Sequence, residues 1–149
     1  MAEPRAPVLV IGVGSELRRD DAAGRRVAEA VSTRALPDVE VRSVHQLTPE
    51  LAEELAGRRT VVIVDASVDV DEIAAVPLDP VSSAPALTHH LDPAALTALA
   101  GRFGWAPTAA VAVHLPVHDL RLGEELSPPT AAAVEQAVDV VVELIGTSV

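Results

Sequence analysis

Three groups of polar residues in this sequence could carry out chemistry. The first is the run SELRRDD at residues 15–21, which follows an apolar run and contains two adjacent carboxylates. The second is Asp65, which comes directly after the strand-like run TVVIV. The third is the sequence THH at residues 88–90. Two carboxylates and an imidazole suit a divalent metal of borderline hardness, so the three groups together form a candidate metal-contacting site.

Each group also has a purely structural interpretation. Asp20 or Asp21 is suited to the N-cap of a following helix, because a carboxylate there accepts backbone N–H groups. Asp65 could cap a turn, although a carboxylate at the end of an apolar run is costly unless it is paired or hydrogen-bonded. His89 and His90 could be solvated loop residues. The residue types alone leave these alternatives open.

Strands and helices that would position these groups alternate along the chain. Apolar or alternating runs predict strands at residues 8–13, 39–44, 60–67 and 108–115, and a weaker edge strand at 73–78. Helical spacing, capping residues and prolines predict helices at residues 21–34, 49–57, 92–102 and 128–145. This order predicts an α/β fold in which residues 1–149 form one three-layer domain. A mostly parallel, twisted sheet of about five strands would carry helices on both faces.

The carboxyl ends of the strands should lie together in such a sheet. Ligands of open α/β sheets bind beyond this edge, and all three polar groups are expected there. His45 and Gln46 follow the second strand and are expected on the rim of the site. His114 and His118 lie in and just after the last strand, and the sequence indicates no role for either.

Composition and missing motifs exclude several classes of protein. The formal net charge of −11 argues against binding nucleic acids or anionic membranes, both of which attract basic surfaces. No cysteine is present, so a metal could be held only by carboxylate, imidazole or backbone oxygen. No apolar stretch approaches the length of a membrane span, and the first apolar run is too short for a signal peptide, so a cytoplasmic location is expected.

The glycines after the first apolar run do not complete a dinucleotide-binding motif. Gly12 and Gly14 match the first two positions of G-x-G-x-x-G, but Leu17 occupies the third. The acidic run that follows is also a poor site for a pyrophosphate. The chain contains neither the G-x-S-x-G of α/β hydrolases nor the H-E-x-x-H of zincins.

Four segments, taken in order, resemble the nickel-iron hydrogenase maturation proteases. They are VLVIGVGSELRRDDAAG, VVIVDAS, LTHHL and LSPPTAAAVEQAVDVVVELI, and together they extend over nearly the whole chain. The family begins with a strand, a G-x-G-N turn and an acid pair, followed by a second acid, a histidine loop and a closing helix. The sequence departs from this pattern at Ser15, where Asn is usual, and at Ala22, where Gly is common.

The resemblance implies both the site residues and the activity. The metal-contacting positions of the family correspond to Asp21, Asp65 and His89, which are also its implied catalytic residues, and His90 occupies a position that varies. The implied function is an endopeptidase that removes the C-terminal extension of a hydrogenase large-subunit precursor after nickel insertion. Nickel would arrive with that substrate, and the enzyme would hold no permanent metal. Two alternatives remain open: a metal-dependent hydrolase with its own ion, and a non-catalytic nickel or maturation chaperone.

Overall fold

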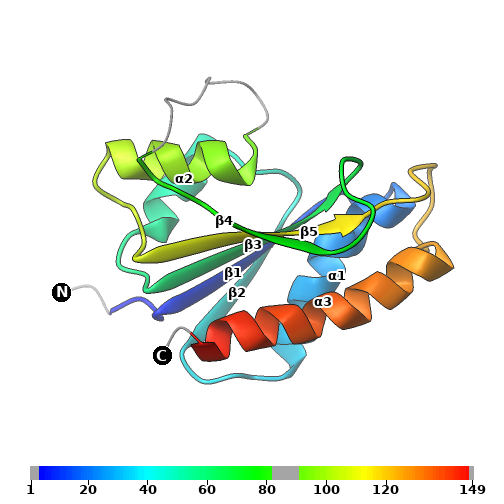
Figure 1. Ribbon diagram of the computed structural model, residues 1–149, viewed down its shortest axis with the longest axis horizontal. Helices are drawn as coiled ribbons and strands as arrows, with labels where there is room; N and C mark the ends of the chain where they lie inside the picture. Colours follow the sequence, from blue (N-terminus) through cyan, green and yellow to red (C-terminus); the bar gives the residue numbers. More distant parts are fainter. Residues whose placement is uncertain (1–3, 82–90, 148–149) are drawn as a thin grey trace.

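The computed structural model describes residues 4–81 and 91–147, and its elements follow the predicted order (Figure 1). The strands are β1 (Val8–Val13), β2 (Val39–Val44), β3 (Thr60–Ser67), β4 (Ala74–Pro77) and β5 (Ala109–Pro116). The α-helices are α1 (Ala23–Thr33), α2 (Pro93–Arg102) and α3 (Pro128–Thr147). Two short 3₁₀ helices are η1 (Arg19–Ala22) and η2 (Pro49–Leu55).

The five strands form one sheet in the order β2-β1-β3-β5-β4. The first four strands in this order are parallel, and β4 pairs antiparallel with β5 at the edge. Figure 1 shows α2 on one side of the sheet and α1 and α3 on the other. The predicted fold class, a three-layer α/β sandwich with a mostly parallel sheet, is therefore confirmed.

Aliphatic side chains fill the core on both faces of the sheet. Along β1, Val8 and Val10 pack against α1 and α3, whereas Leu9 and Ile11 pack against η2 and α2. This alternation follows from the two-residue period of a strand. All four side chains are at most 1% exposed, and burying each one contributes about 1.5–3 kcal/mol. Continuous apolar runs in the sequence therefore correspond to strands covered on both faces.

Glycines allow α1 to approach the carboxyl ends of β1 and β3 closely. Gly14 has a φ of +151°, and a Cβ atom there would lie 1.8 Å from the carbonyl oxygen of Asp21. A Cβ atom on Gly24 would lie 2.3 Å from the carbonyl oxygen of Val64. Only glycine fits such contacts without displacing backbone. Gly14 thus serves the turn that follows β1, and Gly24 allows α1 to pack against β3.

Helix starts agree with the predicted caps only in part. Asp92 caps α2 as predicted, since its Oδ1 accepts a hydrogen bond of 2.7 Å from the N–H of Ala95. Thr48 occupies the N-cap position of η2, but its side chain makes no capping bond, and the segment winds as a 3₁₀ helix. The expected cap at Asp20 or Asp21 is wrong, because α1 begins at Ala23 and both carboxylates bind elsewhere.

Within residues 4–81 and 91–147, no helix combines the length and apolar character needed to cross a membrane.

Candidate functional site

A cavity of about 350 Å³ opens at the carboxyl edge of β1 and β3. Two of the three predicted site residues, Asp21 and Asp65, line it together. The predicted rim residues His45 and Gln46 also line this cavity. The third predicted residue, His89, lies outside the described residues, as does His90. The remaining lining residues are Val13, Gly14, Ser15, Arg18 and Ala66.

Asp65 is held near the end of β3 by a histidine of the neighbouring strand. Its Oδ1 lies 2.6 Å from Nδ1 of His114, and the two residues are register partners in the β3–β5 pair. Both side chains are about one-quarter exposed. Among the described residues, no hydrogen bond is made to Oδ2 of Asp65, so this oxygen is available to a ligand.

Burial raises the pKa of Asp65 above its ordinary value, and the interaction with His114 only partly opposes that increase. The negative charges of Asp92 and Asp21 raise the pKa further. A carboxylate with a raised pKa is a better proton acceptor than an ordinary aspartate. Asp65 therefore has the properties of a general base, and the effect of Asp21 on its pKa reflects how close the two acids lie.

His114 is a neighbour of the candidate site for which the sequence indicated no role. It lies 49 residues after Asp65, and only the parallel pairing of β3 with β5 brings the two together. The cost of an unpaired carboxylate after an apolar run predicts that Asp65 has a partner. Identifying His114 from sequence would have required knowing that β3 and β5 are neighbours and in which register they pair.

Asp21 is fixed by the turn that follows β1. The N–H of Ser15 donates a hydrogen bond of 2.8 Å to Oδ2 of Asp21. The donor is a backbone group, so the turn keeps this bond even though Ser replaces the family's usual Asn. The Ser15 hydroxyl accepts a bond of 3.3 Å from the N–H of Leu17, which further holds the turn. The close approach at Gly14 then sets Asp21 beside the end of the strand.

Asp20 has a structural role that the sequence did not indicate. Its side chain is fully buried, and its Oδ2 accepts the N–H groups of His118 and Asp119 at 2.7 and 2.8 Å. The hydroxyls of Ser127 and Thr130 also donate to Oδ2, and the N–H of Ser127 donates to Oδ1. Burial alone would raise the pKa of Asp20, but these hydrogen bonds outweigh it, and the pKa falls below the ordinary value. Asp20 thus ties η1 to the loop after β5 and to the start of α3.

Replacing Asp20 by alanine should lower the free energy of unfolding by about 3 kcal/mol, because several buried donors would lose their acceptor. Urea denaturation measures this loss. Asp20→Asn is the matched control: its amide oxygen can take the place of Oδ2, which accepts most of the bonds, so the expected loss is only about 1–2 kcal/mol. Equal stability of Asp20→Ala and the wild type would show that this hydrogen-bond network does not support the fold.

The other charged residues of the first group pair with residues outside it, in α1 and in the loop after β5. Glu16 forms an ion pair of 3.2 Å with Arg25, and Arg19 lies 3.8 Å from Asp119. Arg18 lines the cavity, and its Nε donates to the carbonyl of Leu120. The cavity therefore combines two carboxylates with one guanidinium, which suits a ligand that carries both a cation and a polar chain.

Comparisons with known proteins gave matches among solved structures. No protein-family model matches the chain, and no curated protein matches it. The hydrogenase maturating endopeptidase HybD from Escherichia coli superposes with a TM-score of 0.75 at 28% identity, over 95% of this chain and 93% of that one. A hydrogenase 2 maturation peptidase from a Thaumarchaeota archaeon gives a TM-score of 0.71 at 27% identity, over 93% and 97%.

A third structure supports the fold alone because its sequence is more distant. It is a [NiFe] hydrogenase maturation protease, HycI, from Thermococcus kodakarensis, with a TM-score of 0.72 at 21% identity, over 95% of this chain and 94% of that one. The two neighbours at 28% and 27% identity confirm the resemblance to hydrogenase maturation proteases that the sequence indicated, and with it the assignment of the chain as a peptidase.

Proposed function

We propose that this chain is an endopeptidase that removes the C-terminal extension of a nickel-iron hydrogenase large-subunit precursor after nickel has been inserted. The observation that carries the proposal is the shared cavity of Asp21 and Asp65 at the carboxyl edge of the sheet. Its setting is a fold that matches a hydrogenase maturating endopeptidase over 95% of the chain. Two acids in one cavity supply both a cation contact and a proton acceptor.

The nickel would belong to the substrate. Asp21, Asp65 and His89 offer only carboxylate and imidazole ligands, and the chain has no cysteine. Thiolates of the substrate would hold nickel more firmly than these harder ligands. The three residues would therefore contact the ion during cleavage and release it with the product, and the enzyme would need no permanent metal.

We assign the role of general base to Asp65, because burial raises its pKa. In the proposed reaction, the nickel of the substrate would polarise the scissile carbonyl or the water that attacks it. Asp65 accepts a proton from this water as the new carbon–oxygen bond forms. The carbon–nitrogen bond then breaks, and the proton passes to the departing amine, which leaves with the C-terminal extension.

Incubation of the purified chain with a nickel-loaded precursor tests this function against both alternatives. We expect a shortened large subunit, and purified enzyme that contains far less than one metal ion per chain. A stoichiometric metal retained through dialysis would favour a hydrolase with its own ion. Binding of the precursor without any shortened product would favour a chaperone.

A further inference from the structure

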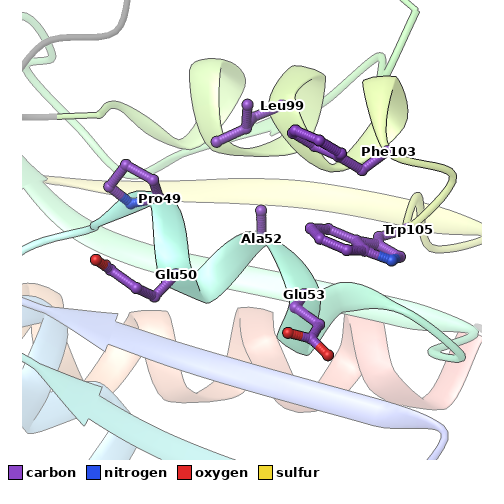
Figure 2. Close-up of a pocket in the computed structure, with 7 residues that line it drawn as sticks. All are labelled: Pro49, Glu50, Ala52, Glu53, Leu99, Phe103 and Trp105. Carbon is purple, nitrogen blue, oxygen red and sulfur yellow. The ribbon is translucent and has the colours of Figure 1, made fainter.

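A second cavity, of about 440 Å³, lies between η2 and α2 on the face of the sheet opposite α1 and α3. We name it the η2–α2 groove. Its apolar lining consists of Pro49, Ala52, Leu99, Phe103 and Trp105. Figure 2 shows Ala52 pointing from η2 toward α2, with Pro49 at one end of the groove and Phe103 and Trp105 at the other. None of these residues lines the cavity of Asp21 and Asp65.

Both aromatic residues of the chain are in this groove. The sequence contains one Phe, one Trp and no Tyr, and the two rings stack with their centroids 4.9 Å apart. Phe103 is 61% exposed. An exposed large aromatic side chain makes little contribution to the core, whereas stacked aromatic rings are typical anchors at binding surfaces. Trp105 is partly buried and also packs against the core, so it is the exposed ring of Phe103 that is better explained by a ligand than by folding.

The groove also has an acidic rim. Glu50 and Glu53 line it, both are exposed, and neither has an ion-pair partner among the described residues. Figure 2 shows Glu50 near the Pro49 end and Glu53 near the Trp105 end. The neighbouring Glu54, in contrast, is paired with Arg5 and Arg42. Apolar walls beside two carboxylates that no cation pairs among the described residues complement a segment that carries an apolar side chain next to Lys or Arg.

We propose that the η2–α2 groove docks a segment of the substrate protein in which an apolar side chain is flanked by lysine or arginine. One basic side chain would lie against Glu53 and the aromatic pair, where a cation–π contact adds to the charge attraction, and Glu50 would attract a basic side chain at the Pro49 end. A second copy of this chain is a poor occupant, because two molecules of formal charge −11 repel each other. This proposal rests on the proposed peptidase function and extends it to recognition away from the scissile bond.

The groove is connected to the site through η2. Pro49 is the first residue of η2 and lies only three positions after Gln46. Gln46 in turn lines the cavity of Asp21 and Asp65. Trp105 lies at the other end of the groove. It comes shortly before Ala109, where β5 begins, and so lies toward the amino edge of the sheet. A docked segment along the groove would thus extend from the amino edge toward the edge where cleavage takes place. Docking there would hold the substrate without touching the reacting atoms.

Reversing the charges of the rim tests the proposal. In cleavage of a nickel-loaded large-subunit precursor, Glu50→Lys/Glu53→Lys should raise KM about tenfold and leave kcat within about twofold, as expected when binding common to ground and transition states is lost. Phe103→Ala should also raise KM. The matched control is Glu135→Lys/Glu143→Lys, which makes the same change in net charge at two exposed positions of α3 and should leave KM unchanged.

A second readout does not depend on cleavage. Because Trp105 is the only tryptophan, protein grown with fluorotryptophan gives one fluorine NMR resonance that reports on the groove. Adding unlabelled precursor should shift this resonance in the wild type and much less in the rim variant. No shift, together with an unchanged KM, would overturn the proposal. A resonance that moves when the protein alone is concentrated would assign the groove to a second copy, and would also overturn it.

The two readouts separate failure of docking from failure of the proposed function. If the wild type does not cleave the precursor at all, the peptidase proposal fails. The resonance still decides the docking proposal in that case: a shift caused by the precursor supports it, and no shift contradicts it. If the wild type cleaves normally and the resonance does not respond, only the docking proposal fails.

Discussion

Replacing Asp65 by asparagine should lower kcat/KM for precursor processing by about 1,000-fold, because the amide keeps the size of the side chain but cannot accept the proton. The structure adds a physical basis for this expectation. Asp65 lines the cavity with Asp21, burial raises its pKa, and His114 holds only one of its two oxygens. Cleavage of a nickel-loaded precursor by wild type and variant, followed over time on a gel, measures the effect. An Asp65→Asn variant with normal activity would reduce Asp65 to a turn residue.

The Asp65→Asn variant should remain folded. The pH dependence of its free energy of unfolding, compared with that of the wild type, tests whether the pKa of Asp65 is raised. Because the folded-state pKa of Asp65 is raised, the unfolded chain loses this proton at a lower pH than the folded protein. Protonated Asp65 therefore contributes fully to the free energy of unfolding at pH values below the pKa that it has in the unfolded chain. This contribution is lost as the pH rises through the pKa that it has in the folded protein. Asp65→Asn does not titrate, so its stability relative to the wild type should increase over that range. Urea denaturation at acidic and neutral pH would show the opposite trend if Asp65 were stabilised as a carboxylate.

Replacing His89 by alanine should lower processing by about 100-fold, whereas His90→Ala should keep most of it. The reason is the resemblance of LTHHL to the histidine loop of the family, in which the first histidine contacts the metal. Adjacent loop residues usually point in different directions, so the two imidazoles should not both face one ion. His90→Ala is the matched control, since it removes the same group one position away.

A side-by-side cleavage assay of the two variants decides which of the two histidines contacts the metal. An imidazole must be neutral to contact a metal, so wild-type processing should also fall at acidic pH as histidine gains a proton. An inactive His90→Ala beside an active His89→Ala would place the metal contact one residue later. Equal, nearly normal activity of both variants would remove this loop from the site.

The sheet was predictable because its signals are local. Continuous apolar runs such as Val61 to Val64 indicate strands buried on both faces, and the alternation of strands with helices limits the topology. Asp92 could be identified as a cap because its partner, Ala95, lies within the same turn. Asp65 could be identified as exceptional because burying a carboxylate is costly, whatever the fold.

What could not be predicted depends on contacts between distant parts of the chain. Asp20 looked like a helix cap, yet its hydrogen-bond donors lie 98 to 110 residues later, around the end of β5 and the start of α3. His114 becomes the partner of Asp65 only through the register of β3 with β5. The η2–α2 groove likewise requires η2 and α2 to pack side by side, and no local pattern shows which surface their side chains leave open.

The central claim is that this chain cleaves a hydrogenase large-subunit precursor and that the nickel of the substrate licenses the cut. The most direct measurement is the intact mass of a purified precursor after incubation with the chain, for a nickel-loaded and a nickel-free sample side by side. We predict that the nickel-loaded precursor loses the mass of its C-terminal extension and that the nickel-free precursor keeps its full mass. Full mass in both samples, or cleavage of both at the same rate, would contradict the account.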